Sequence, residues 1–114
     1  GGQATSAPER PGKWTAALFT QFYRSLNKER KKILGAWIKN KAGVTDVDLI
    51  KLLALKNGKV LGGILSGFAF SAKQLGFDVS DVYERRKVQK ESGRLNEYHL
   101  TDEFRAIAEK CRGR

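Results

Sequence analysis

Glycines, a serine and two lysines lie within one short stretch of this sequence, and together they are suited to holding a phosphate. The segment LGGILSG (61–67) contains three glycines and Ser66, with Lys59 and Lys73 on either side of it. A glycine costs the interior of a helix about 1 kcal/mol relative to alanine, so three of them indicate a special requirement. Close approach of a partner would meet it, because a phosphate backbone could reach the helix amides and Ser66. The alternative is that the glycines let this helix pack closely against another helix of the same domain.

A second group of cations lies between residues 84 and 94. Lys and Arg there are opposed only by Glu84 and Glu91. Long cationic side chains on a hairpin tip can reach phosphates or enter a narrow minor groove. The alternative is a solvated charged edge that prevents strand-to-strand aggregation. The cations of this group are Arg85, Arg86, Lys87, Lys90 and Arg94.

Four other residues are further candidates for contact with a polyanion. Lys31 and Lys32 belong to the basic run KERKK (28–32) at an expected helix start, where positive charge opposes the helix dipole. This placement indicates a phosphate-facing role, and a simple solvated face is the alternative. Phe70 could contact a thymine methyl or stack at a groove edge, unless it packs beneath a hairpin or arm. Gln74 lies at the margin of the same helix face.

No residue pattern indicates catalysis or a metal centre. One cysteine, Cys111, and one histidine, His99, cannot supply a zinc ligand set. LGGILSG lacks the Gly-Lys-Ser or Gly-Lys-Thr ending of a phosphate-binding P-loop, and no strand precedes it. Cys111 lies on an apolar helix face and is expected in the core. His99 is expected to point away from the core, either donating to a phosphate or titrating in water. We therefore expect no enzymatic activity, no cofactor and no metal.

The overall charge favours the same class of partner. The 114 residues include 22 Lys and Arg against 12 Asp and Glu, a formal net charge of +10 at pH 7. Such an excess attracts polyanions, nucleic acid first among them, and the alternative is a merely soluble basic protein. No apolar run reaches the roughly 18 residues that span a bilayer, and no signal-peptide pattern is present. We expect an intracellular protein, cytoplasmic or nuclear, with no membrane partner.

Length and composition predict one domain behind a leader. Residues 1–13 hold both prolines and almost no large apolar groups, so a flexible leader or a remnant of cloning is expected there. Residues 14–112 contain enough apolar and aromatic side chains for a single core. Because the sequence contains no methionine, we expect an excerpt from a longer protein.

Hydrophobic periodicity, caps and turn residues predict helices and a hairpin. Asn27, Thr45 and Thr101 are expected N-caps. Gly93 is expected at the hairpin turn, and Asn57 with the glycine after it is expected in a turn with positive φ. Helices are expected at 14–25, 28–41, 46–55, 59–75 and 102–111, and strands at 82–88 and 95–100.

Stepping 100° per residue divides the helix 59–75 into two faces. Its inner face is expected to carry Val60, Leu61, Ile64, Leu65, Phe68, Ala72 and Leu75. Its outer face is expected to carry Lys59, Gly62, Gly63, Ser66, Phe70 and Lys73, with Gln74 at the margin. Val47 and Leu52 are expected on the core side of the helix 46–55.

The order helix, helix, turn, helix, hairpin, helix across residues 28–111 resembles the winged helix-turn-helix superfamily of DNA-binding domains. The segment YHLTDEF (98–104) is similar to the end of a wing that passes into a final helix. The resemblance implies a mainly α fold with a small antiparallel β-hairpin, here preceded by an extra N-terminal helix. It implies that 59–75 is the recognition helix in the major groove and that the hairpin, about 82–100, is the wing. Many such recognition helices expose several Arg, Asn or Gln, whereas this one does not, so strong direct base readout is not expected.

Charge, hairpin and resemblance together predict a DNA-binding domain of a transcription regulator, a replication protein or a mobile-element protein. Double-stranded DNA is the expected partner. Winged helices also serve as protein-interaction modules, so a protein partner or a second copy docking around Phe70 is the alternative. RNA binding is a third possibility, because basic surfaces track phosphates and aromatic side chains stack on unpaired bases.

Overall fold

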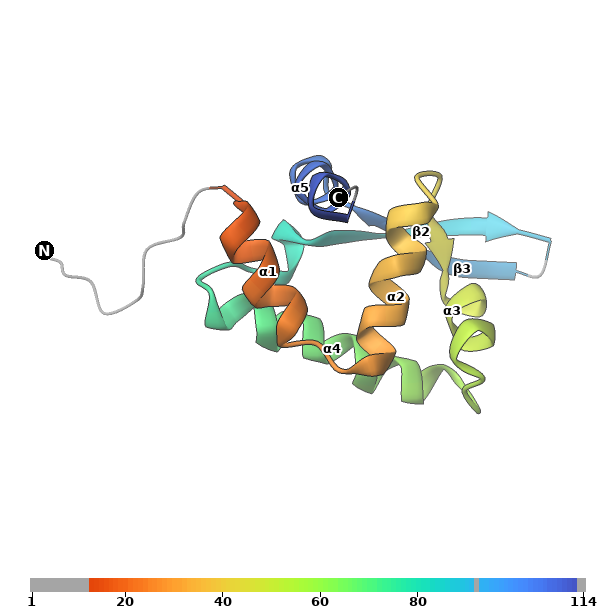
Figure 1. The fold of residues 1–114 in the computed structure, drawn as a ribbon. Helices are drawn as coiled ribbons and strands as arrows, with labels where there is room; N and C mark the ends of the chain where they lie inside the picture. Colours follow the sequence, from red (N-terminus) through yellow and green to blue (C-terminus); the bar gives the residue numbers. More distant parts are fainter. Residues whose placement is uncertain (1–12, 92, 113–114) are drawn as a thin grey trace, which may run out of the picture.

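The computed structural model describes residues 13–91 and 93–112, which form α-helices and a small antiparallel sheet (Figure 1). The expected leader therefore lies outside the described residues except for Lys13, and so does Ser92 in the hairpin turn. The elements in chain order are α1 (Ala16–Arg24), α2 (Lys28–Lys39), β1 (Val44–Thr45), α3 (Asp46–Leu53), α4 (Gly58–Gln74), the 3-10 turn η1 (Val79–Asp81), β2 (Tyr83–Lys90), β3 (Gly93–Leu100) and α5 (Asp102–Arg112).

The expected fold class, mainly helical with a small antiparallel hairpin, is confirmed at that level. β2 and β3 pair from Tyr83 opposite Leu100 to Lys90 opposite Gly93. The sequence did not predict β1, which pairs with β3 and completes a sheet of order β1-β3-β2. β1 has only two residues, too few for the alternating pattern that identifies a strand.

Side-chain caps fix the starts of three helices where the sequence predicted them. The Asn27 side chain accepts from the Arg30 amide at 2.9 Å at the start of α2. Thr45 and Asp48 form a reciprocal capping box at the start of α3, with bonds of 3.2 and 3.1 Å. At α5 the Thr101 hydroxyl accepts from the backbone amide three residues later at 3.3 Å. These caps satisfy amides that would otherwise lack a helical partner.

The expected turn with positive φ at Asn57 is wrong. Asn57 has an extended backbone, with φ −164°, and its side chain accepts from the amides of Lys59 and Val60 at 3.0 and 3.1 Å. It is therefore the N-cap of α4, and Gly58 is the first helical residue. Gly93, in contrast, lies at the hairpin turn as predicted, and its φ there is +117°.

Aromatic side chains from several elements meet in the core. Phe22 of α1, Trp37 of α2 and Phe68 of α4 are at most 1% exposed. Trp14, just before α1, stacks on Phe77, just after α4, with ring centroids 3.9 Å apart. This contact joins the N-terminal helix to the rest of the domain. The expected inner face of α4 is confirmed by burial of Leu61, Ile64, Leu65, Phe68 and Ala72, with Leu75 half-buried.

Three apolar residues expected in the core lie at the surface instead. Val60 is 44% exposed, Leu52 44% and Val47 37%. Val60 precedes by one helical turn the point where Arg30 of α2 hydrogen-bonds α4, at Ile64. The apolar pattern of α4 alone could not show that its first turn leaves Val60 exposed.

Candidate nucleic-acid interface

One row of exposed residues runs along the side of α4 that faces away from the core. Positions 59, 63, 66, 70 and 73 are spaced alternately by four and three residues, which keeps them on one side of a helix. All of them are exposed, as are the flanking Gly62 and Gln74. The division of α4 into two faces thus agrees with the prediction except at Val60. We call Lys59, Gly63, Ser66, Phe70 and Lys73 the outer row of α4.

The three glycines of the segment 61–67 have different surroundings. A Cβ added at Gly62 or Gly63 would meet nothing within 4 Å, so no part of the described chain packs there. A Cβ at Gly67 would overlap the guanidinium of Arg30, whose Nε donates to the Ile64 carbonyl at 2.7 Å. Close packing against another helix therefore explains Gly67 and does not explain Gly62 or Gly63.

Phe70 does not pack beneath the hairpin or any other part of the described chain. Phe70 is 65% exposed and lies between Ser66 and Lys73 in the outer row. The exposed ring is open to contact by a partner and could bury a large apolar area there. Ser66, one turn earlier, donates only to the Gly63 carbonyl, at 2.7 Å.

The β2–β3 hairpin divides its cations between two faces, because successive strand side chains point to opposite sides. Arg86 and Lys90 lie on one face and form ion pairs with glutamates. Arg86 Nη2 is 3.2 Å from Glu84 Oε1, and Lys90 Nζ is 3.8 Å from Glu97 Oε2. The side chains of Arg86 and Lys90 are exposed to solvent. Their ion pairs are therefore weak.

The opposite face of the hairpin carries Arg85, Lys87 and Arg94. Their register positions place them on the same side of the sheet as Tyr83 and Tyr98, which turns toward α4. All three cations are exposed, and none forms an ion pair with a residue in the described ranges. The hairpin cations available to an anion therefore share the side of α4.

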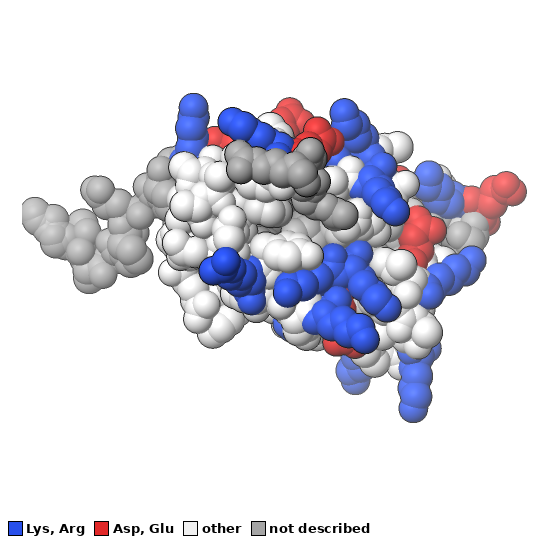
Figure 2. Space-filling model, viewed as in Figure 1, with Lys and Arg blue, Asp and Glu red and all other residues white. Residues whose placement is uncertain are grey.

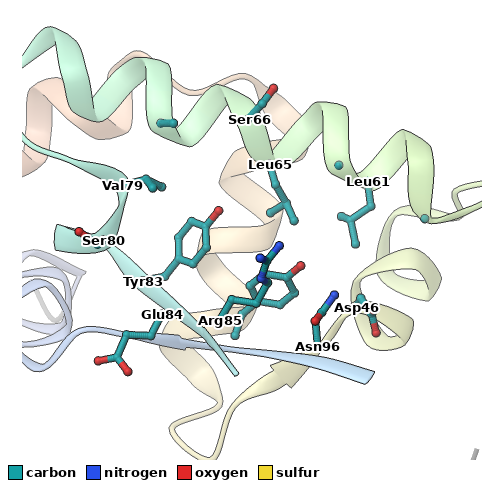
Figure 3. Close-up of a pocket in the computed structure, with 14 residues that line it drawn as sticks. Asp46, Leu61, Leu65, Ser66, Val79, Ser80, Tyr83, Glu84, Arg85 and Asn96 are labelled. Carbon is teal, nitrogen blue, oxygen red and sulfur yellow. The ribbon is translucent and has the colours of Figure 1, made fainter. Parts of the chain in front are cut away.

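An open groove of about 590 Å³ lies between α4 and the inner part of the hairpin (Figure 3). Tyr83 and Arg85 point from β2 into the groove toward α4, while Glu84 points to the other side of the strand (Figure 3). The side of the groove that α4 forms consists largely of residues with small side chains, so few side chains project from it. Among the lining residues are Gly58, Leu61, Gly62, Leu65, Ser66 and Ala69 from α4.

Two tyrosines on the sheet side of the groove are neutral at physiological pH. Burial raises the pKa of Tyr83 to about 12, and Tyr98 adds to the rise. Burial also raises the pKa of Tyr98, with a contribution from the Asp46 carboxylate and an opposing one from Arg85. The Tyr83 hydroxyl is therefore an uncharged group beside the Arg85 guanidinium, and it does not repel an anion.

His99 is not the solvent-facing histidine that the sequence predicted. Its Nε2 is 2.7 Å from Glu97 Oε1, and only 16% of its side chain is exposed. Gly43 makes room for the ring by adopting φ +110°, and a Cβ there would overlap it. The alternation of β3 correctly places His99 opposite Tyr98, but the loop before β1 covers that face.

Lys31 and Lys32 lie on α2, and the structure does not bring them to the outer row of α4. Lys31 is partly buried, with its Nζ 5.0 Å from the ring centroid of Tyr23, whereas Lys32 is exposed. Arg30, which the sequence placed on the outside with them, turns inward to α4. The candidate residues therefore fall into two groups, one on α4 and the hairpin and one on α2.

Comparison with protein-family models, curated proteins and solved structures found no match to this chain. Within residues 13–91 and 93–112, no group of three or more His, Cys, Asp or Glu could hold a metal ion. In that same part of the chain, no helix is long and apolar enough to cross a membrane. Cys111 is half-buried against the core, close to its expected place.

The sequence did not identify the groove or its sheet-side residues. Tyr83, Asn96 and Tyr98 line it, although none was a candidate. The alternation of β2 contained part of the signal, since Tyr83 and Arg85 are two positions apart and must share a face. The pairing register that adds Asn96 and Tyr98 to that face could not be read from the strand patterns alone.

Proposed function

We propose that this chain is a winged helix-turn-helix domain that binds double-stranded DNA. In this proposal α3 and α4 are the helix-turn-helix, α4 enters the major groove, and the β2–β3 hairpin is the wing. The element order, the three-stranded sheet and the hairpin that extends beyond the helices support it (Figure 1). The domain would belong to a regulator of transcription, a replication protein or a mobile-element protein.

The open outer row of α4 is the observation that carries the proposal. Gly62 and Gly63 reduce helix stability, and nothing among the described residues packs on them. Lys59 and Lys73 are separated by 14 positions, roughly 21 Å along the helix axis. A helix that lies along the major groove can therefore hold the two ammonium groups near phosphates at both ends of its contact.

The glycines determine which kind of DNA recognition the helix favours. With no side chain at Gly62 and Gly63, the α4 backbone can approach the groove floor more closely than an ordinary recognition helix. Ser66 and Phe70 offer only a hydroxyl and an apolar ring for base edges. We therefore infer that affinity comes mainly from phosphate contacts and that sequence preference is modest.

Duplex DNA is favoured over duplex RNA by the shape of its major groove. A B-form groove admits an α-helix, whereas the A-form major groove is too deep and narrow for one. A helix whose outer face carries small residues between two lysines fits the B-form major groove and cannot enter the A-form major groove. The hairpin cations Arg85, Lys87 and Arg94 would then contact the neighbouring backbone.

A protein partner is the second candidate, and the exposure of Phe70 favours it. Self-association through α4 is disfavoured, because an antiparallel pair centred on Ser66 would place Lys59 opposite Lys73 at both ends. A partner protein would need acidic groups at those ends. The net charge of +10 favours a nucleic acid over a protein as the partner.

Fluorescence anisotropy with labelled duplex DNA, single-stranded DNA and duplex RNA at two salt concentrations tests the proposal. We expect the tightest binding to duplex DNA and an affinity that falls steeply with salt, since each released counterion adds to the log-log slope. Tighter binding to either other nucleic acid would replace duplex DNA as the ligand. No binding to any of them would leave the protein partner as the better account.

A further inference from the structure

The outward side of α2 is a second cationic surface, separate from the outer row of α4. Lys28, Lys32 and Lys39 are all exposed. Each lies two positions from an inward-pointing residue, Arg30 for the first two and Trp37 for the third, and two positions are about 200° apart around a helix. Arg30 hydrogen-bonds a carbonyl of α4, and Trp37 is 1% exposed. The three lysines therefore point away from α4 and from the core.

Acidic residues do not balance this surface. α2 contains five Lys or Arg and one acid, Glu29, a net charge of +4. Figure 2 shows Lys and Arg side chains gathered over the part of the molecule where α2 runs. Lys28, Lys32 and Lys39 form no ion pair with any residue that the structure describes. We call Lys28, Lys32 and Lys39 the lysine face of α2.

Two lysines of this face, Lys28 and Lys32, are unfavourable for the start of α2. Lys28 and Lys32 are four positions apart, where like charges repel. Positive charge in the first turn also opposes the helix dipole. Since neither charge stabilises the start of α2, an anionic partner gives the better reason for Lys28 and Lys32.

The chemistry of the surface favours a nucleic acid over a lipid membrane. A helix that binds at a membrane surface buries an apolar face in the lipid. The apolar face of α2, formed by Ile33, Leu34 and Trp37, is already buried in the core. The charged residues that remain exposed are mostly lysines, and lysines suit a row of phosphates.

We propose that the lysine face binds the backbone of a second duplex, so that one molecule joins two DNA segments. This inference rests on the proposed binding of a first duplex at α4. DNA has a persistence length of about 50 nm, so a duplex on the outer row stays nearly straight across the domain. It leaves the lysine face, which points in another direction, free for a second duplex.

Energy transfer between two short duplexes, one labelled with a donor and one with an acceptor, tests this inference. The variant Lys28→Gln/Lys32→Gln/Lys39→Gln removes the lysine face. The variant Lys13→Gln/Arg24→Gln/Lys110→Gln is the control, because it removes the same charge from exposed cations outside both surfaces and outside α3. Anisotropy with a single duplex is measured on the same proteins.

We expect energy transfer with the parent and the control variant. The lysine-face variant is expected to bind the single duplex within about threefold of the parent, since the outer row is intact. Its energy transfer should fall to the level without protein. Undiminished transfer would overturn the inference, because another surface or a dimer would then join the duplexes.

Other outcomes separate this inference from the proposed function. Binding of a single duplex without energy transfer in the parent would refute the second site and leave the first. No duplex binding at all would refute the proposed function. Loss of binding to phosphatidylserine vesicles in the lysine-face variant, without any joining of duplexes by the parent, would assign the face to membranes instead.

Discussion

Gly63 and Gly67 lie one turn apart on α4, yet only Gly67 has a neighbouring side chain packed against it. At Gly67 the side of the helix is occupied by Arg30, which donates to the Ile64 carbonyl at 2.7 Å. At Gly63 there is open space. The same residue type therefore serves internal packing at one turn of the helix and leaves the outer row of α4, here called the bare side, open at the turn before. Only the bare side needs a partner from outside the domain to account for it.

The largest expected effect is on the bare side. Ser66→Glu should lower the affinity for duplex DNA by about 100-fold, because placing like charges together costs several kcal/mol and each tenfold corresponds to about 1.4 kcal/mol. Ser66→Ala is the control and should bind nearly as the parent does. Fluorescence anisotropy measures both, and thermal unfolding checks that both fold. Equal binding by Ser66→Glu and the parent would mean that the bare side does not meet DNA.

The same substitution at the two glycines should change stability in opposite directions. Gly63→Leu should raise the free energy of unfolding by up to about 1 kcal/mol, because leucine is a better helix former and meets no obstacle. Gly67→Leu should lower it by about 1 kcal/mol, because loss of the Arg30 hydrogen bond outweighs the gain in helix propensity. Urea unfolding measures both. A loss of stability at Gly63 would show that the bare side is packed.

The two faces of the hairpin should differ in a smaller way. Replacing Arg85, Lys87 and Arg94 together by glutamine should lower the log-log salt slope of duplex binding by about three. Replacing Arg86 and Lys90 should lower it by less than one, since these cations already pair with glutamates on the face away from α4. Equal effects per charge would show that the whole hairpin tip, rather than one face, meets the backbone.

The smallest effect concerns the tyrosines under the groove and is confined to alkaline pH. Because the pKa of Tyr83 is raised from 10.0 to about 12, the folded state favours the neutral phenol. Its contribution to stability is present below pH 10 and is lost as the pH rises toward 12. Tyr83→Phe should therefore flatten the fall in unfolding free energy across that range. An unchanged pH profile would mean that Tyr83 ionises equally in the folded and unfolded chain.

Most helices could be predicted from the sequence because local signals define them. Asn27, Thr45 and Thr101 cap helices as expected. The helical periodicity of the apolar residues identified the buried side of α4. The exposed outer row followed from the same periodicity. These features depend on residues close together in the chain.

The remaining features depend on contacts between distant residues. The guanidinium of Arg30 reaches α4 across 34 positions, so nothing in the local pattern separated Gly67 from Gly63. β1 is recognisable only by its partner β3, and His99 is covered by Gly43 from the loop before β1. The groove likewise needs both α4 and the hairpin to be in place.

Amide resonances of the isotope-labelled protein, recorded while duplex DNA is added, test the central claim most directly. We expect the amides of Gly62, Gly63 and Ser66 to shift or broaden at the first equivalent of duplex, because the backbone of α4 lies against the groove. The amide of Gly43, on the covered side of the sheet, should stay in place as an internal control. If Gly62, Gly63 and Ser66 are unchanged when the duplex is saturating, the bare side of α4 is not the DNA-binding surface.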